Sequence, residues 1–121
     1  MVLWVGARVL FVPVEVVVKL VPVPKVARVP GVTDDLLGVG LVDGEAVPVL
    51  AIGPERASVL VCTHDGERMG VVGHSRSATG FFPADPAGAG VLVDAEVAEV
   101  LDLAGLAGGV QRTSRGSRLP A

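Results

Sequence analysis

The sequence predicts an all-β fold built from short strands. Apolar residues make up 50% of the 121 residues. Valine is the most frequent of them, and its branched Cβ suits a pleated sheet better than a helix. Sixteen glycines and nine prolines divide the chain into short segments. The apolar runs recur about every 8–12 residues with turn residues between them, which is typical of sandwiches and small barrels.

The first strands are expected near the N-terminus. Met1–Val5 and Arg8–Val12 are apolar runs joined by Gly6-Ala7, which is the spacing of a tight hairpin. A longer Val-rich run from Val14 to Val23 is the next expected strand. Prolines at positions 13, 22 and 24 place breaks or edge positions at its ends, because proline has no N–H to donate to a strand ladder.

A loop and a second hairpin follow. Pro30-Gly31 and Asp34-Asp35 mark the loop. Leu37–Val42 and Ala46–Ile52 are apolar runs on either side of Asp43-Gly44. An Asp-Gly pair between two such runs is a strong signal for a hairpin turn.

The third hairpin has the clearest pattern. Ser58–Thr63 and Arg68–Val72 are apolar runs separated by residues 64–67, so strand, turn and strand follow in order. The polar segment His74–Thr79 and the Pro- and Gly-rich segment Phe82–Gly90 are expected to be loops.

The segment Val91–Gly109 supports two interpretations. In the first, Asp94 caps a helix of about three turns that Gly108-Gly109 ends. In the second, a strand from Val97 to Leu103 is followed by a short helical turn. The residues that recur at helical spacing are Val97, Val100, Leu101 and Ala104. Local pattern alone leaves both interpretations open.

Composition limits the class of protein. With 19% charged residues and a high apolar content, the chain is not disordered. Its longest apolar stretch, Val16–Pro24, contains Lys19 and two prolines and is well short of the ~18 residues of a membrane helix. Met1–Arg8 lacks the basic leader of a secretory signal. The lone Cys62 cannot form an internal disulfide, so we expect a cytoplasmic protein.

The charge distribution is uneven. The formal charge of the chain is −3, and the segment 111–121 holds Arg112, Arg115 and Arg118 without an acid. Removing these three positive charges leaves −6 on residues 1–110. An acidic body with few aromatic side chains does not resemble a nucleic-acid binder. We expect residues 1–110 to form one domain and 111–121 to form a mobile tail.

The candidate chemical groups do not form a catalytic pattern. Cys62 and His64 share a strand face, but zinc needs three or four ligands. His74 beside Ser75 and Ser77 suggests a base and a nucleophile, yet any loop of this composition offers the same neighbours. The glycines at 38, 40 and 44 lack the spacing of a dinucleotide fingerprint. We therefore expect a binding module that has no catalytic residue, cofactor or metal.

Ordered landmarks along the chain resemble the CheW-like family of chemotaxis adaptors. The spacing from Gly38 to Gly44 to Pro48 is similar to the Gly, Arg-Gly and Pro-Val landmarks of that family. The segments that carry the resemblance are Phe11–Val21, Val26–Gly31, Leu37–Gly44, Val47–Leu50, Val59–Cys62, Met69–Gly73 and Val93–Leu106. No one of these segments is specific alone; their order and spacing together carry the resemblance, which covers about residues 1–106.

The resemblance implies two small SH3-like five-stranded β-barrel subdomains that share a core, with a short helical turn at the C-terminal end. It favours a strand that ends near Leu103. It also implies a non-catalytic scaffold that links a methyl-accepting chemoreceptor to a CheA-type histidine kinase, in the cytoplasm and near receptor clusters. The alternative is a small β-barrel module, unrelated to chemotaxis, that binds a peptide or a ligand.

Two charges depart from the family pattern. A Glu commonly stands in the family where this chain has Lys19, and an Arg where it has Asp43. A pair with swapped signs still attracts at close range, while the field that a partner meets is inverted. We expect a protein-binding groove around Lys19 and Asp43 that includes Val17, Val42 and Glu45. The alternatives are that the two charges are unrelated surface groups and that Val17 belongs to the core.

The segment between Phe82 and Gly90 is shorter than the corresponding connection of the family. We expect a reduced second barrel that lacks a strand and a loop and leaves an open strand edge. Such an edge can recruit another chain, including a second copy, by strand addition. A reduced adaptor that keeps only one of its two partners is similar to the accessory adaptor of the frizzy gliding-motility pathway in myxobacteria.

Overall fold

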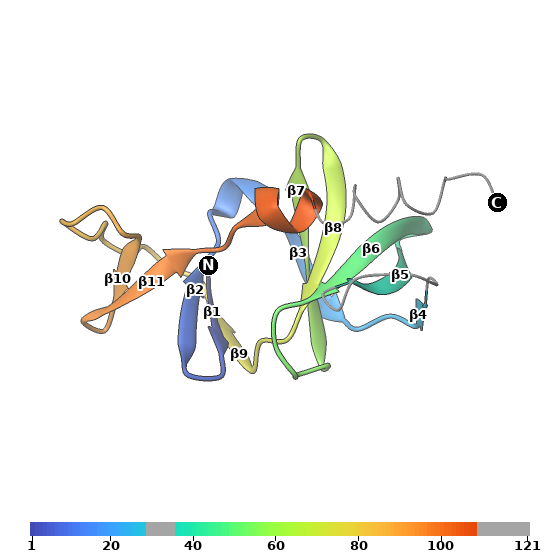
Figure 1. The fold of residues 1–121 in the computed structure, drawn as a ribbon, viewed down its shortest axis with the longest axis horizontal. Helices are drawn as coiled ribbons and strands as arrows, with labels where there is room; N and C mark the ends of the chain where they lie inside the picture. Colours follow the sequence, from blue (N-terminus) through green and yellow to red (C-terminus); the bar gives the residue numbers. More distant parts are fainter. Residues whose placement is uncertain (29–35, 109–121) are drawn as a thin grey trace.

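The computed structural model describes residues 1–28 and 36–108 and has the all-β fold that the sequence predicts. Two sheets lie side by side, as Figure 1 shows. The small sheet has five strands in the order β10-β11-β2-β1-β9, and the barrel sheet has six in the order β3-β7-β8-β6-β5-β4. The strands are β1 (Val2–Val5), β2 (Arg8–Phe11), β3 (Val17–Pro22), β4 (Val26–Ala27), β5 (Leu36–Val42), β6 (Glu45–Ala51), β7 (Ser58–His64), β8 (Glu67–Val72), β9 (Arg76–Ala78), β10 (Val91–Val93) and β11 (Glu96–Val100).

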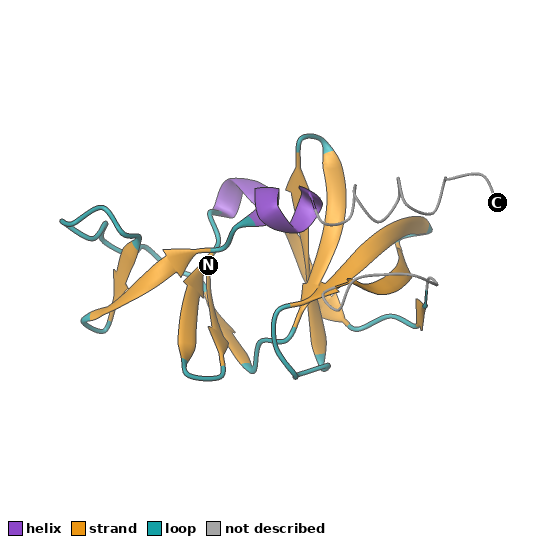
Figure 2. Cartoon of the chain, viewed as in Figure 1, coloured by secondary structure: helices purple, strands orange, loops and turns teal. Residues whose placement is uncertain are grey.

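Helical structure in the described part is confined to two short segments (Figure 2). A 3-10 helix, η1, covers Val14–Val16, and a second helix covers residues 103–108. The single strand predicted for Val14–Val23 is therefore wrong at its beginning. Pro13, the residue before this helix, has an extended backbone. The N–H of Val16 then donates to the carbonyl of Pro13 at 3.1 Å, which closes a helical turn before β3 begins. Among the described residues, no helix has the length and apolar character that a membrane crossing requires.

The three predicted hairpins are confirmed. Gly6-Ala7 joins β1 to β2, Asp43-Gly44 joins β5 to β6, and the β7–β8 turn needs only Asp65-Gly66 because His64 and Glu67 already pair across the ladder. Asp43 and Asp65 each have a positive φ, near 50°, which Asp tolerates better than most residues. Asp followed by Gly is therefore well suited to these tight turns.

The segment predicted as a polar loop after His74 contains a strand. β9 pairs with β1, and the Arg76 guanidinium lies 4.0 Å from the centroid of the Trp4 ring. The N–H of Ser75 donates to the carbonyl of Trp4 at 2.8 Å. This cation–π contact and the ladder keep a polar segment in an extended conformation, although its sequence has no apolar alternation.

The ambiguous C-terminal segment forms a hairpin followed by a helix. β10 and β11 pair across Asp94-Ala95, and both turn residues have positive φ. The interpretation as one long helix is therefore wrong, and the strand ends at Val100, before Leu103. Asp102 then begins the helix, since its carboxylate accepts the N–H of Gly105 at 2.9 Å.

The small sheet has five strands, so the expected loss of a strand is not seen, but two of its strands are short. β9 and β10 have three residues each. The connection between them folds back along β10: Leu92 donates its N–H to the carbonyl of Pro83 at 2.8 Å, and Ala84 bridges to Val91. Within the described residues, the outer side of β9 has no paired strand. The open edge is therefore very short.

The barrel sheet curls so that its two edge strands come near each other. β3 and β4 lie at opposite ends of the strand order, yet only residues 23–25 connect them. Such a short connection is possible only if the sheet closes on itself. Its interior is the barrel core, which consists of six buried valines: Val42, Val47, Val49, Val59, Val61 and Val72.

A second core lies between the two sheets and is called the inter-sheet core here. Strands β7 and β8 supply both cores, since alternate residues along each strand face opposite sides. This explains why β7 is apolar without alternation. The buried members of the inter-sheet core are Leu3, Val5, Leu10, Val12, Leu36, Leu50, Leu60, Cys62, Met69, Val71, Leu101 and Leu103. The shared core implied by the family resemblance is thus present.

Two glycines make the backbone crossing between the sheets possible. Gly73 follows β8 with φ +127, and its Cα faces the backbone of Gly53 so closely that a Cβ there would lie 2.6 Å from the Cα of Gly53. His74 follows immediately and is 6% exposed, with no hydrogen-bond partner on Nδ1. Burial lowers the pKa of His74 below its ordinary value of 6.5.

We expect His74 to make stability depend on pH. The unfolded chain binds a proton near pH 6.5 while the folded chain, whose pKa is lower, does not, so stability falls as pH falls below about 6.5. Urea unfolding of the wild type and of His74→Leu between pH 8 and pH 5 measures this. The difference in free energy of unfolding between the wild type and the variant should narrow as pH falls, or reverse so that the variant is the more stable protein. A constant difference across this range would contradict the prediction.

Two predictions concern residues that the structure does not describe. The loop at Pro30-Gly31 and Asp34-Asp35 and the tail from 111 to 121 lie outside the described residues.

Candidate functional site

Two charges predicted to face a partner meet at one end of the barrel. Lys19 is on β3 and Asp43 is in the turn between β5 and β6, and their side chains form an ion pair. β3 and β5 are not neighbours in the sheet, so the closure of the barrel brings the two residues together. The hydrogen bond from Lys19 and its positive charge, with a smaller contribution from Arg68, hold the pKa of Asp43 below its ordinary value.

A second ion pair extends the first. The Arg68 guanidinium of β8 lies 3.5 Å from the carboxylate of Glu45, the residue that begins β6. Because Arg68 also acts on Asp43, the four groups form one set of alternating charges, called the rim cluster here: Lys19, Asp43, Glu45 and Arg68. All four side chains are about one third or more exposed, so they are accessible to a partner.

The two apolar residues of the predicted groove are placed differently. Val42 is 5% exposed and belongs to the barrel core, so its side chain cannot contact a partner. Val17 is half-buried and packs against the inter-sheet core, as the core interpretation holds. Of the five predicted residues, the structure brings Lys19, Asp43 and Glu45 together at the surface.

Arg68 is the residue of the rim cluster that the sequence does not predict. It lies 23 residues after Glu45. It reaches Glu45 because β8 runs parallel to β6, with Val49 opposite Gly70. Parallel pairing between distant strands leaves no local spacing pattern. The surplus of charges near two hairpin turns is the only available signal.

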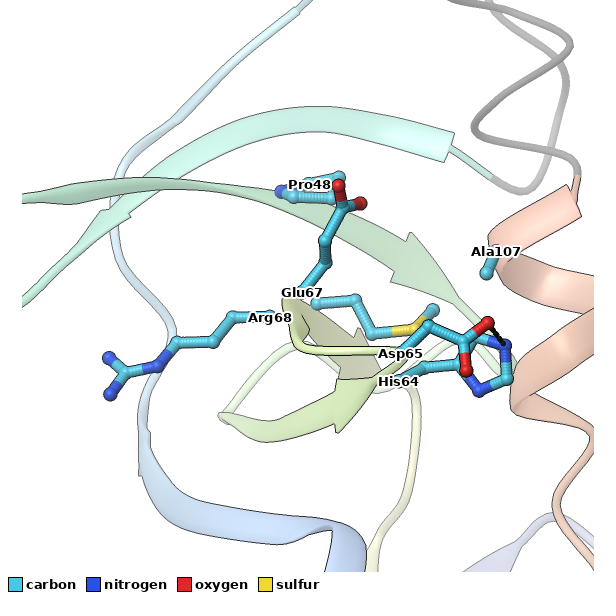
Figure 3. A pocket seen from close by; sticks show the side chains of 7 residues that line it. Pro48, His64, Asp65, Glu67, Arg68 and Ala107 are labelled. Carbon is cyan, nitrogen blue, oxygen red and sulfur yellow. Dashed lines mark ion pairs between the residues drawn. The ribbon is translucent and has the colours of Figure 1, made fainter.

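A pocket adjoins the rim cluster between the β7–β8 hairpin and the C-terminal helix (Figure 3). It has a volume of about 240 Å³ and is called the hairpin pocket here. Its apolar lining comes from Pro48, Met69 and Ala107, and its polar lining from His64, Asp65, Glu67 and Arg68. Arg68 is therefore shared by the pocket and the rim cluster.

A wider groove lies where the small sheet, β6 and the C-terminal helix meet, with a volume of about 530 Å³. Its apolar lining includes Leu10 and Ile52, and its charged lining consists of Arg8, Glu99 and Asp102.

The groups considered for catalysis are not arranged for it. Cys62 is fully buried, and burial raises the pKa of its thiol to about 11, so it is not a thiolate near neutral pH. The Ser75 hydroxyl donates to the carbonyl of Trp4 at 3.2 Å, and His74 is not its partner. Within residues 1–28 and 36–108, no three side chains of His, Cys, Asp or Glu gather as metal ligands do.

Comparison with known proteins supports the fold. The sequence matches no protein-family model and no curated protein. Among solved structures, the scaffolding protein TtCheW from Thermoanaerobacter tengcongensis is similar, with a TM-score of 0.53 and 14% sequence identity. The match covers 58% of this chain and 52% of TtCheW, so it spans about half of that protein. The chain therefore has a CheW-like fold.

Proposed function

We propose that this chain is a non-catalytic signalling adaptor. It links a methyl-accepting chemoreceptor to a CheA-type histidine kinase in a chemotaxis or gliding-motility pathway, or it binds only one of these two partners. Its contact surface includes the rim cluster. The work of such an adaptor is binding alone, and it takes place in the cytoplasm at receptor clusters.

The observation that carries this proposal is the CheW-like fold, since TtCheW is a scaffolding protein. The charges support it further. Ion pairs that are one third or more exposed contribute little to folding, so two such pairs gathered in one cluster are better explained by recognition.

The inverted signs of Lys19 and Asp43 suggest a partner with matching changes. An adaptor with the usual charges presents an acid on β3 and a base on the β5–β6 turn. This chain presents the base on β3. A partner adapted to one arrangement meets like charges in the other, which weakens binding and so separates two adaptors in one cell.

Binding of two partners from the same organism tests the proposal. The titrants are the cytoplasmic tip of a chemoreceptor and the regulatory domain of a CheA-type kinase. We expect this chain to bind at least one of them, and Lys19→Glu/Asp43→Arg to change the affinity for that partner by roughly tenfold. The double variant keeps the net charge and opposite charges at the two positions. Arg at the positive φ of residue 43 adds about 1 kcal/mol of strain, so far-UV circular dichroism of the variant verifies that the fold is retained.

Glu96→Lys is the matched control, since Glu96 is exposed on β11 in the other sheet. It changes the net charge by two, more than the double variant does, yet it should leave the affinity nearly unchanged. Binding to neither partner would refute the adaptor proposal and favour a small β-barrel module for a peptide or a ligand. If the control and the double variant changed the affinity equally, the rim cluster would not be part of the contact surface.

A further inference from the structure

His74 lies on the connection that joins β8 of the barrel sheet to β9 of the small sheet (Figure 1). On the barrel side, Gly73 lies against the backbone of Gly53. On the side of the small sheet, the N–H of Ser75 donates to the carbonyl of Trp4 at 2.8 Å, and the Ser75 hydroxyl donates to the same carbonyl at 3.2 Å. The backbone of His74 is therefore held by a contact on each side, one residue away.

The surroundings of the His74 imidazole suit its neutral form. The residue is 6% exposed, and Nδ1 has no hydrogen-bond partner among the described residues. A neutral imidazole carries one N–H, whereas the protonated ring carries two and needs an acceptor for each. Protonation of His74 in this place would bury a cation with an unpaired donor, which costs much more than burying the neutral ring.

Among the described residues, no acid offsets such a charge. Burial lowers the pKa of His74, and no charged group of the described residues shifts it further. The charged side chains on the segments around the crossing are Arg8, Glu55, Arg56 and Arg76, and β1 carries none. The one acid among them is exposed. Arg56 donates to the carbonyl of Gly53 at 2.6 Å, and Arg76 lies over the Trp4 ring. The nearby charges therefore do not favour an imidazolium.

The two strands next to His74 differ in how firmly they are held. β8 pairs with both β6 and β7 and contributes side chains to the barrel core and to the inter-sheet core. β9 has only the residues Arg76–Ala78 and, within the described part of the chain, pairs with β1 alone. Local opening occurs where few hydrogen bonds and little buried surface hold the chain. A charge on His74 is therefore accommodated by movement of β9 and not of β8.

We propose that protonation of His74 releases β9 from β1, which gives the small sheet an acid-sensitive edge. Release brings the imidazolium into water and breaks the hydrogen bonds between Ser75 and Trp4. It also moves Arg76 away from the Trp4 ring and leaves β1, whose four residues are apolar, at the edge of the sheet. An unpaired apolar strand is a template for strand addition. The release is a property of the fold and stands apart from the proposed function.

Acid favours the open state. There the imidazole is in water with a pKa near 6.5, while the closed state holds the pKa of His74 below that value. The ratio of open to closed molecules therefore rises up to about tenfold for each pH unit below about 6.5, until the closed state also binds the proton. Between pH 7.5 and pH 5, the ratio rises by up to roughly thirtyfold.

Hydrogen exchange of the folded protein in low urea tests the release. The probe is the Ser75 amide, and the reference is the Ile52 amide, which donates to the carbonyl of Val72 at 2.8 Å on the barrel side. Local release exposes little surface, so the exchange of Ser75 should hardly depend on urea, whereas the exchange of Ile52 should depend on it strongly. Between pH 7.5 and pH 5, we expect the protection factor of Ser75 to fall at least fivefold.

The two histidines of the chain provide a matched pair of variants. His74→Leu removes the titrating group, so pH should no longer change the protection factor of Ser75. His64→Gln removes the other histidine, which lies in the β7–β8 hairpin with its side chain 30% exposed, and should behave as the wild type. Far-UV circular dichroism verifies that both variants are folded.

The wild type decides the outcome even if His74→Leu does not fold. A protection factor of Ser75 that stays constant between pH 7.5 and pH 5, or that depends on urea as that of Ile52 does, would overturn the proposal. An unchanged pH dependence in folded His74→Leu would overturn it as well.

Discussion

Gly73→Ala is expected to destabilise the fold by about 3 kcal/mol. Two effects add at this residue. A Cβ would lie within 2.7 Å of the Cα and carbonyl oxygen of Gly53, and overpacking against backbone that cannot move costs about 1–3 kcal/mol. The φ of Gly73, +127, lies in a region that residues with a side chain rarely adopt, and this strain adds about 1–3 kcal/mol. Urea unfolding followed by far-UV circular dichroism measures the loss.

Gly66→Ala is the control for the strain that a positive φ causes in a residue with a side chain. Gly66 also has a positive φ, +79, but a Cβ there would meet nothing within 4 Å. Its substitution should therefore cost only about 1 kcal/mol. Equal losses in the two variants would mean that the close approach of Gly53 and Gly73 has no energetic weight, and the account of the crossing between the sheets would be wrong.

The hairpins are predictable because their signals are local. Asp43-Gly44 and Asp65-Gly66 each combine a residue that tolerates positive φ with a glycine, between two apolar runs. The C-terminal hairpin lacks this signal. Its turn is Asp94-Ala95, and alanine rarely adopts the φ of 68° that it has here, so helical spacing competes with the strand interpretation.

Strands that depend on distant partners are not predictable from local pattern. β9 is polar and exists because β1, at the other end of the chain, supplies a ladder and the Trp4 ring. The family resemblance predicts the count of subdomains, whereas the three-residue lengths of β9 and β10 follow from tertiary packing.

The candidate site is predictable in part for the same reason. Lys19 and Asp43 stand out by comparison with the family pattern, and Glu45 lies beside the turn. Val42 resembles a surface residue only if its position beside the turn is considered alone. Its place two residues after Gly40 on β5 puts it on the inner face of the barrel. Arg68 and the hairpin pocket arise from a parallel pairing and a distant helix.

Leu60→Ala is the second substitution with a large expected effect. Leu60 is 0% exposed on β7 and belongs to the inter-sheet core, which both sheets share. Removing a buried leucine side chain costs about 2–5 kcal/mol, depending on how far the cavity collapses. For a domain of this size, such a loss shifts the urea midpoint by roughly 2 M.

Trp4 makes this variant informative about cooperativity, since it is the single tryptophan and lies on β1 of the small sheet. The substitution is in the barrel sheet. If the shared core makes the two sheets one folding unit, Trp4 fluorescence and hydrogen exchange of the β6 and β8 amides will report the same loss of stability. Leu20→Ala on β3 is the control, since Leu20 is 41% exposed. It should change the stability reported by Trp4 and by the β6 and β8 amides far less. A Trp4 transition that does not move in Leu60→Ala would mean that the small sheet folds independently of the barrel.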